Sequence, residues 1–272
     1  MRVRLPSLSA CVVAVLVSQA PPVSAAEVLR VGGTGGATAL LAHVGKDFTR
    51  RTGIEVEVVP SLGSGGGIAA VAGRALDLAV SGRPLSEAER ARGLIQAAAV
   101  RTPYVLATSH PAPPAMSGRE VADAYADAKA AWPDGSPIRL ILRPRAESDN
   151  LVLVSLSPSM AAALEGARRR DDLPVAATDQ DNADTAERLA GSLTGATYTQ
   201  VTMERRDLRM IAIGGVAPTM EAFEGGAYRY AKVLHVVHPQ RPSAAAARFV
   251  DHLRGDAGRR ALREAGCLPG AE

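Results

Sequence analysis

SLGSGGG, at residues 61–67, lies between an extended apolar run at 54–59 and a short helical run that begins at Ile68. Its four glycines and two serines let the backbone approach another group closely. The first amides of the following helix have no partner within that helix, and the helix dipole adds partial positive charge there. An anion is therefore the natural occupant of such a turn. A flexible turn without a ligand is the alternative, but the chain repeats the pattern elsewhere.

The same order of strand, small-residue turn and helix occurs on both sides of this stretch. Upstream, a strand at 28–31 is followed by the turn GGTGG at 32–36 and a helical pattern. Downstream, the strand candidate at 75–81 is followed by a turn and another helical pattern. This alternation predicts an α/β fold with a mostly parallel sheet and helices on both faces. Ligands bind beyond the carboxyl ends of such strands, so the turns are expected to share one edge.

A second set of elements follows the proline-rich break at 110–114. Its strand at 138–142 leads into RPRAESDN, at 143–150, directly before another helical run. Arg143 and Arg145 have the planar guanidinium that suits oxyanions, although solvated surface arginines are the alternative. Later in this set, Asp181 or Asn182 is expected to cap a helix.

The chain is therefore expected to form two lobes. We predict that the first lobe contains residues 26–106 and 235–272, and that the second contains residues 107–234. The long extended run at 228–237 is predicted to cross back to the first lobe.

The N-terminus has the pattern of a secretory signal. Charged residues precede an apolar run at 8–17, and small residues predict cleavage near Ala25 or Ala26. Cys11 lies in a lipoprotein-like box, but that box comes too early in the apolar run. We therefore expect a soluble exported protein in which Cys267 is the remaining cysteine, which excludes an internal disulfide. The net charge is only +3, and the sequence contains no run of basic residues with interleaved aromatics. Nucleic acid is therefore not an expected partner.

The ordered motifs GGTGG (32–36), GSGGGI (63–68), LDLAVSGRPL (76–85) and GGAY (225–228) resemble those of periplasmic phosphate-binding proteins of ABC transporters. The resemblance implies a type II periplasmic binding protein fold, with two α/β lobes joined by two crossover strands. It also implies closure on a dehydrated tetrahedral oxyanion, and a transporter permease in the membrane as partner. We expect a monomer without cofactor or metal.

The resemblance also implies a set of ligand-binding residues from both lobes. They are Thr34, Gly35, Gly36, Ser64, Gly65, Ser81, Arg143, Arg145, Ser148, Asp149 and Asn150. Two departures bear on selectivity. Gly82 stands where the family has an aspartate that accepts the proton of hydrogen phosphate, and Asp149 stands where the family has glycine. Asp149 caps the following helix, replaces the missing proton acceptor or repels a dianion.

Other classes of function have weaker support. The 61–67 stretch lacks the first glycine of a nucleophile elbow, which argues against an exported hydrolase. GGTGG is only a partial dinucleotide fingerprint. His235 and His238 lie in a predicted strand, where their spacing places them on opposite faces. The expected function is capture of an oxyanion without covalent chemistry, with phosphate as the leading candidate. Sulfate, molybdate, phosphonate and a sensory role remain alternatives.

Overall fold

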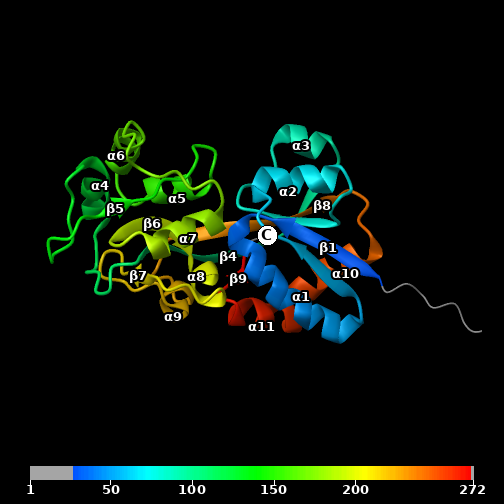
Figure 1. The fold of residues 1–272 in the computed structure, drawn as a ribbon. Helices are drawn as coiled ribbons and strands as arrows, with labels where there is room; N and C mark the ends of the chain where they lie inside the picture. The colour runs from blue at the N-terminus through cyan, green and yellow to red at the C-terminus, as the bar shows by residue number, and fades with distance from the viewer. Residues whose placement is uncertain (1–26, 271–272) are drawn as a thin grey trace, which may run out of the picture.

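The computed structural model describes residues 27–270, which form two lobes joined by extended strands (Figure 1). The predicted signal, with its cleavage site near Ala25 or Ala26, lies outside these residues. Among residues 27–270, no helix combines the length and apolar character needed to cross a membrane.

Lobe 1 is built on the parallel strands β1 (Val28–Gly33), β2 (Glu55–Val59) and β3 (Leu78–Ser81), in the order β2-β1-β3. Apolar side chains of the flanking helices, among them Phe48 and Phe249, are buried against these strands. The helices of lobe 1 are η1 (Gly35–Ala37, a 3-10 turn), α1 (Thr38–Thr52), α2 (Gly63–Ala72), α3 (Glu87–Ala91), α10 (Ala244–Arg254) and α11 (Asp256–Glu264).

Lobe 2 has its own sheet and its own core. Strand β6 (Ser192–Thr197) pairs in parallel with β5 (Arg139–Leu140), while β7 (Arg209–Ile211) lies on the other side of the shared strand β4. Buried aromatic residues, including Tyr125 and Trp132, fill the interior of this lobe. The helices of lobe 2 are α4 (Gly118–Ala126), α5 (Asp149–Val154), α6 (Met160–Ala167), α7 (Asp179–Arg188), α8 (Tyr198–Met203) and α9 (Met220–Glu224).

Two long strands, β4 (Leu94–Thr108) and β8 (Ala231–Pro239), run between the lobes. The first part of β4 pairs with β8 and with β9 (Leu268–Pro269), whereas its last residues pair with β6 and β7. The expected crossover strands are therefore present. The predicted lobe limits fall inside β4 and β8, and the limits themselves stay a prediction.

The sheet is mixed, and its parallel and antiparallel strand pairs lie in different parts of the molecule. Parallel pairs occur inside the lobes, between β1 and β2, β1 and β3, and β5 and β6, where strand-helix-strand alternation predicted them. Every pair made by β4 or β8 is antiparallel. The chain leaves lobe 1 along β4 and returns along its neighbour β8, so these two strands run in opposite directions.

Glycines bring α2 against the end of β1. A Cβ added at Gly67 would lie 2.7 Å from the Cα of Gly33, and Gly33 itself has a φ of 129°. A side chain at Gly67 would therefore push the helix away from the strand, whereas a side chain at Gly33 would clash with the backbone of Val80 in β3. This close approach fixes the start of α2 at the edge of the sheet, where its free amides face the other lobe.

The start of α7 differs from the prediction. Thr178, and not Asp181 or Asn182, is the N-cap: its hydroxyl accepts a hydrogen bond from the amide of Asp181 at 3.0 Å. The Asp181 carboxylate accepts one from the amide of Thr178 at 3.2 Å, which completes a capping box. The helix thus begins earlier, and Asp179 and Gln180 lie in its first turn.

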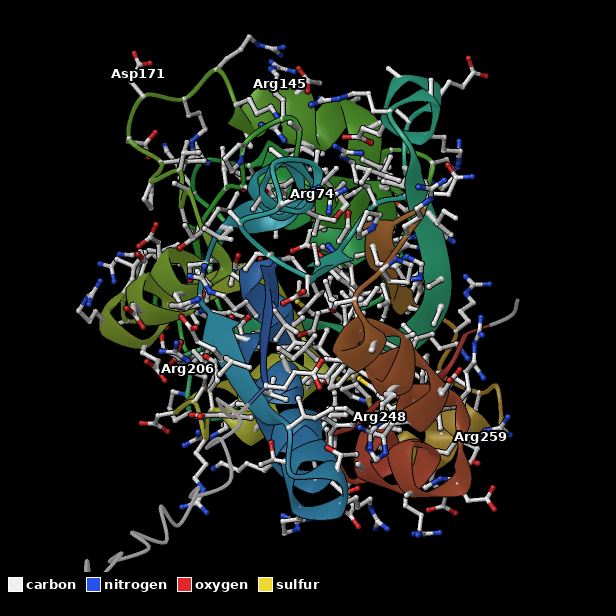
Figure 2. The ribbon with its side chains drawn as sticks, turned by 90° about the vertical axis from the view of Figure 1, so that its right-hand side faces the viewer. Arg74, Arg145, Asp171, Arg206, Arg248 and Arg259 are labelled. Carbon is white, nitrogen blue, oxygen red and sulfur yellow. The ribbon has the colours of Figure 1, made fainter. Side chains whose placement is uncertain are left out.

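Arginine side chains lie on many elements. The labelled arginines of Figure 2 include Arg74 after α2, Arg206 after α8 and Arg259 in α11, which lie in different parts of the molecule. Arg206 lies within a network with the carboxylates of Asp184 and Glu204. The positive charge is therefore dispersed over the surface.

Candidate functional site

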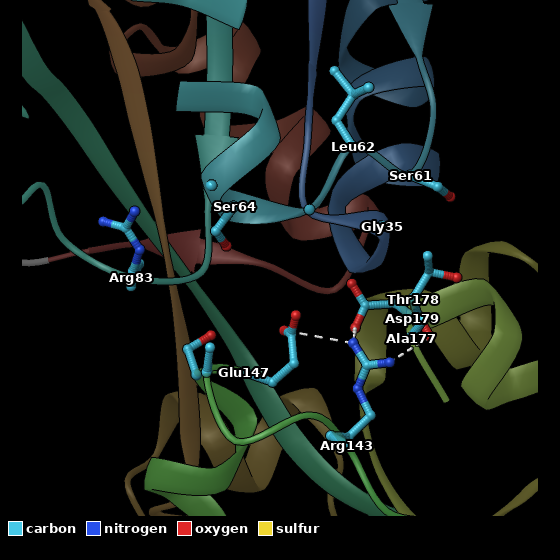
Figure 3. A pocket seen from close by; sticks show the side chains of 14 residues that line it. Gly35, Ser61, Leu62, Ser64, Arg83, Arg143, Glu147, Ala177, Thr178 and Asp179 are labelled. Atoms are coloured by element: carbon cyan, nitrogen blue, oxygen red, sulfur yellow. Dashed lines mark hydrogen bonds and ion pairs between the residues drawn. The ribbon is translucent and has the colours of Figure 1, made fainter. Parts of the chain in front are cut away.

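A cavity of about 370 Å³ lies where loops of the two lobes meet (Figure 3). Lobe 1 contributes the turn before α2 and the turn after β3, and lobe 2 contributes the loops before α5 and α7. The lining residues are Gly35, Ser61, Leu62, Gly63, Ser64, Gly65, Arg83, Arg143, Ala146, Glu147, Ser148, Ala177, Thr178 and Asp179.

The glycine-rich turn of lobe 1 lines the cavity as predicted from the sequence. Ser61 and Gly63 have positive φ values of 55° and 70°, which turns the chain sharply into α2. The hydroxyl oxygen of Ser64 accepts a hydrogen bond from the amide of Gly82 at 2.9 Å. Its proton remains available to a group in the cavity.

Of the two predicted arginines, Arg143 is the one that lines the cavity. Its side chain is 5% exposed, and its Nη1 donates to the carbonyl oxygen of Ala176 at 2.7 Å. Arg145, by contrast, is 68% exposed and pairs with Glu165 on the outside of lobe 2 at 2.6 Å. Of the two arginines that the sequence offered, the structure brings Arg143 to the other lining residues.

Asp179 is the centre of the hydrogen bonds that join the lobes at the cavity. One carboxylate oxygen, Oδ2, accepts from the hydroxyl of Thr34 at 2.9 Å and from the amide of Gly36 at 2.7 Å. The other, Oδ1, accepts from Nη2 of Arg143 at 3.0 Å. A hydroxyl, a backbone amide and a guanidinium from both lobes therefore converge on one negatively charged group.

Glu147 is a second carboxylate at the cavity. Its Oε2 lies 3.5 Å from Nη2 of Arg143. Burial raises the pKa of Glu147 above its usual value. The carboxylates of Asp179 and Asp149 also raise this pKa, while the positive charges of Arg143 and Lys232 oppose the rise.

The third acidic residue, Asp149, does not cap the following helix, contrary to one of its predicted roles. It forms a buried ion pair with Lys232 of β8, and Nζ of Lys232 also donates to the hydroxyl of Ser148 at 2.7 Å. Ser148 is the N-cap of α5, and no side chain caps that helix. Asp149 is 5% exposed and is not one of the residues that line the cavity. Its carboxylate faces Lys232 instead.

Lys232 and Ser148 fill the space next to Gly82. A Cβ added at Gly82 would lie 2.7 Å from Oγ of Ser148 and 3.1 Å from Nζ of Lys232. A side chain at position 82 would therefore displace the buried ion pair. Where the resembled family has a proton acceptor, this protein has two hydrogen-bond donors.

Arg83 is the remaining cation at the cavity, at its lobe 1 edge. Its guanidinium donates two hydrogen bonds to Glu89, at 2.7 and 2.8 Å, and these lower the pKa of Glu89 to about 2. The positive charge of Arg83 is thus balanced by a neighbour of its own lobe.

The predicted site residues fall into two groups. Thr34, Gly35, Gly36, Ser64, Gly65, Arg143 and Ser148 line the cavity or bind Asp179. The other four face elsewhere: Ser81 bonds within the turn to Arg83, Asn150 donates to the carbonyl oxygen of Pro144, Arg145 pairs with Glu165, and Asp149 pairs with Lys232.

The sequence patterns did not single out Asp179, Glu147 or Lys232. The pattern Thr178-x-x-Asp181 is a capping box that would have placed Asp179 in the first turn of α7. Lys232 lies in the extended run predicted at 228–237, and a lysine that is buried in such a strand requires a negatively charged partner. Glu147 carries no comparable signal, because its orientation depends on the fold of the loop.

Within residues 27–270, no three His, Cys, Asp or Glu side chains are placed to hold a metal ion.

A family model described as a PBP superfamily domain matches residues 20–256. No curated protein matches the chain significantly.

Solved structures share the fold at low sequence identity. A Clostridium perfringens protein, assigned as a phosphate ABC transporter substrate-binding protein and solved with bound phosphate, is 14% identical, with a TM-score of 0.73; the match covers 90% of this chain and 100% of that chain. A phosphate-binding protein from Stenotrophomonas maltophilia is 13% identical, with a TM-score of 0.63 and coverage of 91% of each chain. The periplasmic molybdate-binding protein of Azotobacter vinelandii is 14% identical, with a TM-score of 0.62, covering 89% of this chain and 100% of that chain. These matches confirm the predicted two-lobe fold.

Proposed function

We propose that this chain, which belongs to the PBP superfamily, is an exported solute-binding protein that captures an inorganic oxyanion, phosphate first, for an ABC transporter. It acts as a monomer and performs no covalent chemistry. The lobes close about β4 and β8, and closure excludes water from the cavity. Each hydrogen bond to the captured anion then gains strength, and each unpaired polar group becomes costly.

One observation supports this proposal above the others. The Thr34 hydroxyl, the Gly36 amide and the Arg143 guanidinium converge on a single carboxylate, at 2.9, 2.7 and 3.0 Å. Such a set of charge-assisted donors is what an oxyanion requires. Two of the donors come from lobe 1 and one from lobe 2, so an anion held by all three would keep the lobes together.

A fully deprotonated oxyanion such as sulfate or molybdate is the second candidate. Lys232 and Ser148 occupy the space beside Gly82, so no carboxylate there accepts a ligand proton. Donors on that side favour an anion that presents only acceptors. For hydrogen phosphate, the acceptor would have to be Glu147 or Asp179.

Isothermal titration of the purified mature protein tests the proposal. Phosphate, sulfate, molybdate and a phosphonate are titrated at two pH values. We expect saturable binding of at least one inorganic oxyanion, with the order of affinities deciding between the two candidates. Absence of binding to all four ligands at both pH values would contradict the proposed function.

A further inference from the structure

We propose that Asp179 is a built-in competitor for the anion, and that with Gln180 it forms a latch that holds the lobes closed in the absence of an anion; a bound anion takes the place of the carboxylate. The proposal rests on the proposed function, because the competitor and the anion share the same donors.

The carboxylate of Asp179 satisfies the donors that an oxyanion would use. Thr34 and Arg143 are each 5% exposed, so water has little access to either donor. Asp179 lies 145 residues from Thr34 in the sequence and belongs to the other lobe. An anion that binds these donors must therefore first displace the carboxylate.

Gln180 adds contacts to lobe 1 beside Asp179. Its Oε1 accepts from the hydroxyl of Ser61 at 2.6 Å, and its Nε2 donates to the carbonyl oxygen of Gly35 at 3.0 Å. A Cβ at Gly35 would lie only 2.1 Å from this Oε1. The bare backbone at position 35 thus lets the latch reach lobe 1.

The fold of α7 does not require the side chain of Asp179. Thr178 and Asp181 form the capping box of the helix with each other. The carboxylate of Asp179 instead points away from its own helix toward Thr34 and Arg143, as Figure 3 shows for the arginine. A role in the site therefore explains its position better than a role in the helix.

Removal of this carboxylate is expected to strengthen anion binding. Asp179→Ala should bind phosphate or sulfate roughly 10- to 100-fold more tightly, because the anion no longer has to displace a carboxylate from charge-assisted hydrogen bonds. Asp179→Asn keeps the shape but removes the charge, and should have a smaller gain. Gln180→Ala weakens the latch without freeing Arg143, so its gain should be smaller still.

The experiment measures binding and lobe closure separately. Titration calorimetry with phosphate and sulfate compares wild type, both Asp179 variants, Gln180→Ala and the control Asp171→Asn, which changes an exposed carboxylate of lobe 2. Spin labels on exposed helix positions, Lys46→Cys in lobe 1 and Ala162→Cys in lobe 2, report the distance between the lobes with and without anion.

We expect the wild type without added anion to be closed, and Asp179→Ala to show longer, broader distances that shorten on binding. Unchanged distances together with equal or weaker anion binding would overturn the proposal and make Asp179 a support for Arg143. If no variant binds any anion, the proposed function and the competition fail together, while the distances still decide whether the latch exists. Circular dichroism of every variant confirms folding, and Asp179→Asn serves if the alanine variant unfolds.

Discussion

The two lobes present different chemistry to the cavity. Lobe 1 contributes mainly neutral donors, such as the hydroxyls of Thr34 and Ser64 and the free amides of a helix start, and the charge of its Arg83 is balanced by Glu89. Lobe 2 contributes charged groups, namely Arg143, Glu147 and Asp179. Neutral donors can hold any oxyanion of suitable size, whereas charged groups respond to the charge and protonation of the ligand. We infer that lobe 1 provides general anion affinity, and that lobe 2 sets selectivity and pH dependence.

Loss of the lobe 2 guanidinium should have the largest effect. Arg143→Ala leaves Asp179 and Glu147 without their cation, and breaking a buried ion pair costs about 3–5 kcal/mol of folding stability. Anion affinity should fall by at least about 100-fold, since the charge-assisted bond is lost while two carboxylates remain. Calorimetry and urea unfolding measure the two effects.

Arg145→Ala is the matched control. This arginine is 68% exposed, and its pair with Glu165 should contribute at most about 1 kcal/mol. Equal losses of affinity in the two variants would remove the distinction between the arginines.

The buried pair behind the cavity should have the next largest effect, on stability. Lys232→Met leaves the carboxylate of Asp149 buried and unpaired, at a cost of about 3–5 kcal/mol. The double variant Lys232→Met, Asp149→Leu removes both charges and should recover most of this loss, as thermal and urea unfolding can measure. A double variant no more stable than the single one would show that the cost has another origin, such as the lost bond to Ser148.

The difference between the lobes also explains what the sequence could predict. The glycine-rich turns and the strand-helix alternation of lobe 1 depend on neighbouring residues, so the fold and the Ser64 side of the cavity were predictable. The decisive contacts of lobe 2 join distant residues: Asp149 and Lys232 are 83 positions apart, and Asp179 and Thr34 are 145 apart. Local patterns contain no information about which carboxylate meets which cation. For the same reason they could not decide between Arg143 and Arg145.

A substitution in lobe 1 should have a more moderate effect. Ser64→Ala removes a hydroxyl from the cavity and leaves the amide of Gly82 without its acceptor, which should cost about 1–3 kcal/mol of stability. Anion affinity should fall roughly tenfold for every oxyanion tested, because a hydroxyl does not distinguish them. Ser155→Ala, which changes a surface serine of lobe 2, is the control. A loss confined to one anion would contradict the view of lobe 1 as a general anion holder.

The smallest expected effect is the pH dependence that Glu147 gives to lobe 2. Burial, Asp179 and Asp149 raise the pKa of Glu147, so this carboxylate takes up a proton at higher pH than an ordinary glutamate. As pH falls toward this raised pKa, the cavity loses one negative charge and repels an anion less. Sulfate, which stays a dianion over this range, should therefore bind several-fold more tightly at lower pH, with proton uptake on binding.

Glu147→Gln should flatten this pH profile and bind sulfate at neutral pH at least as tightly as the wild type does at low pH. Glu165→Gln is the control, because the pKa of Glu165 is lowered by Arg145 on the outer face of lobe 2. Calorimetry in buffers of different ionisation enthalpy separates proton uptake from binding heat. A wild-type slope that persists in Glu147→Gln would assign the pH dependence to another group of lobe 2, and Asp179 would then be the next carboxylate to substitute.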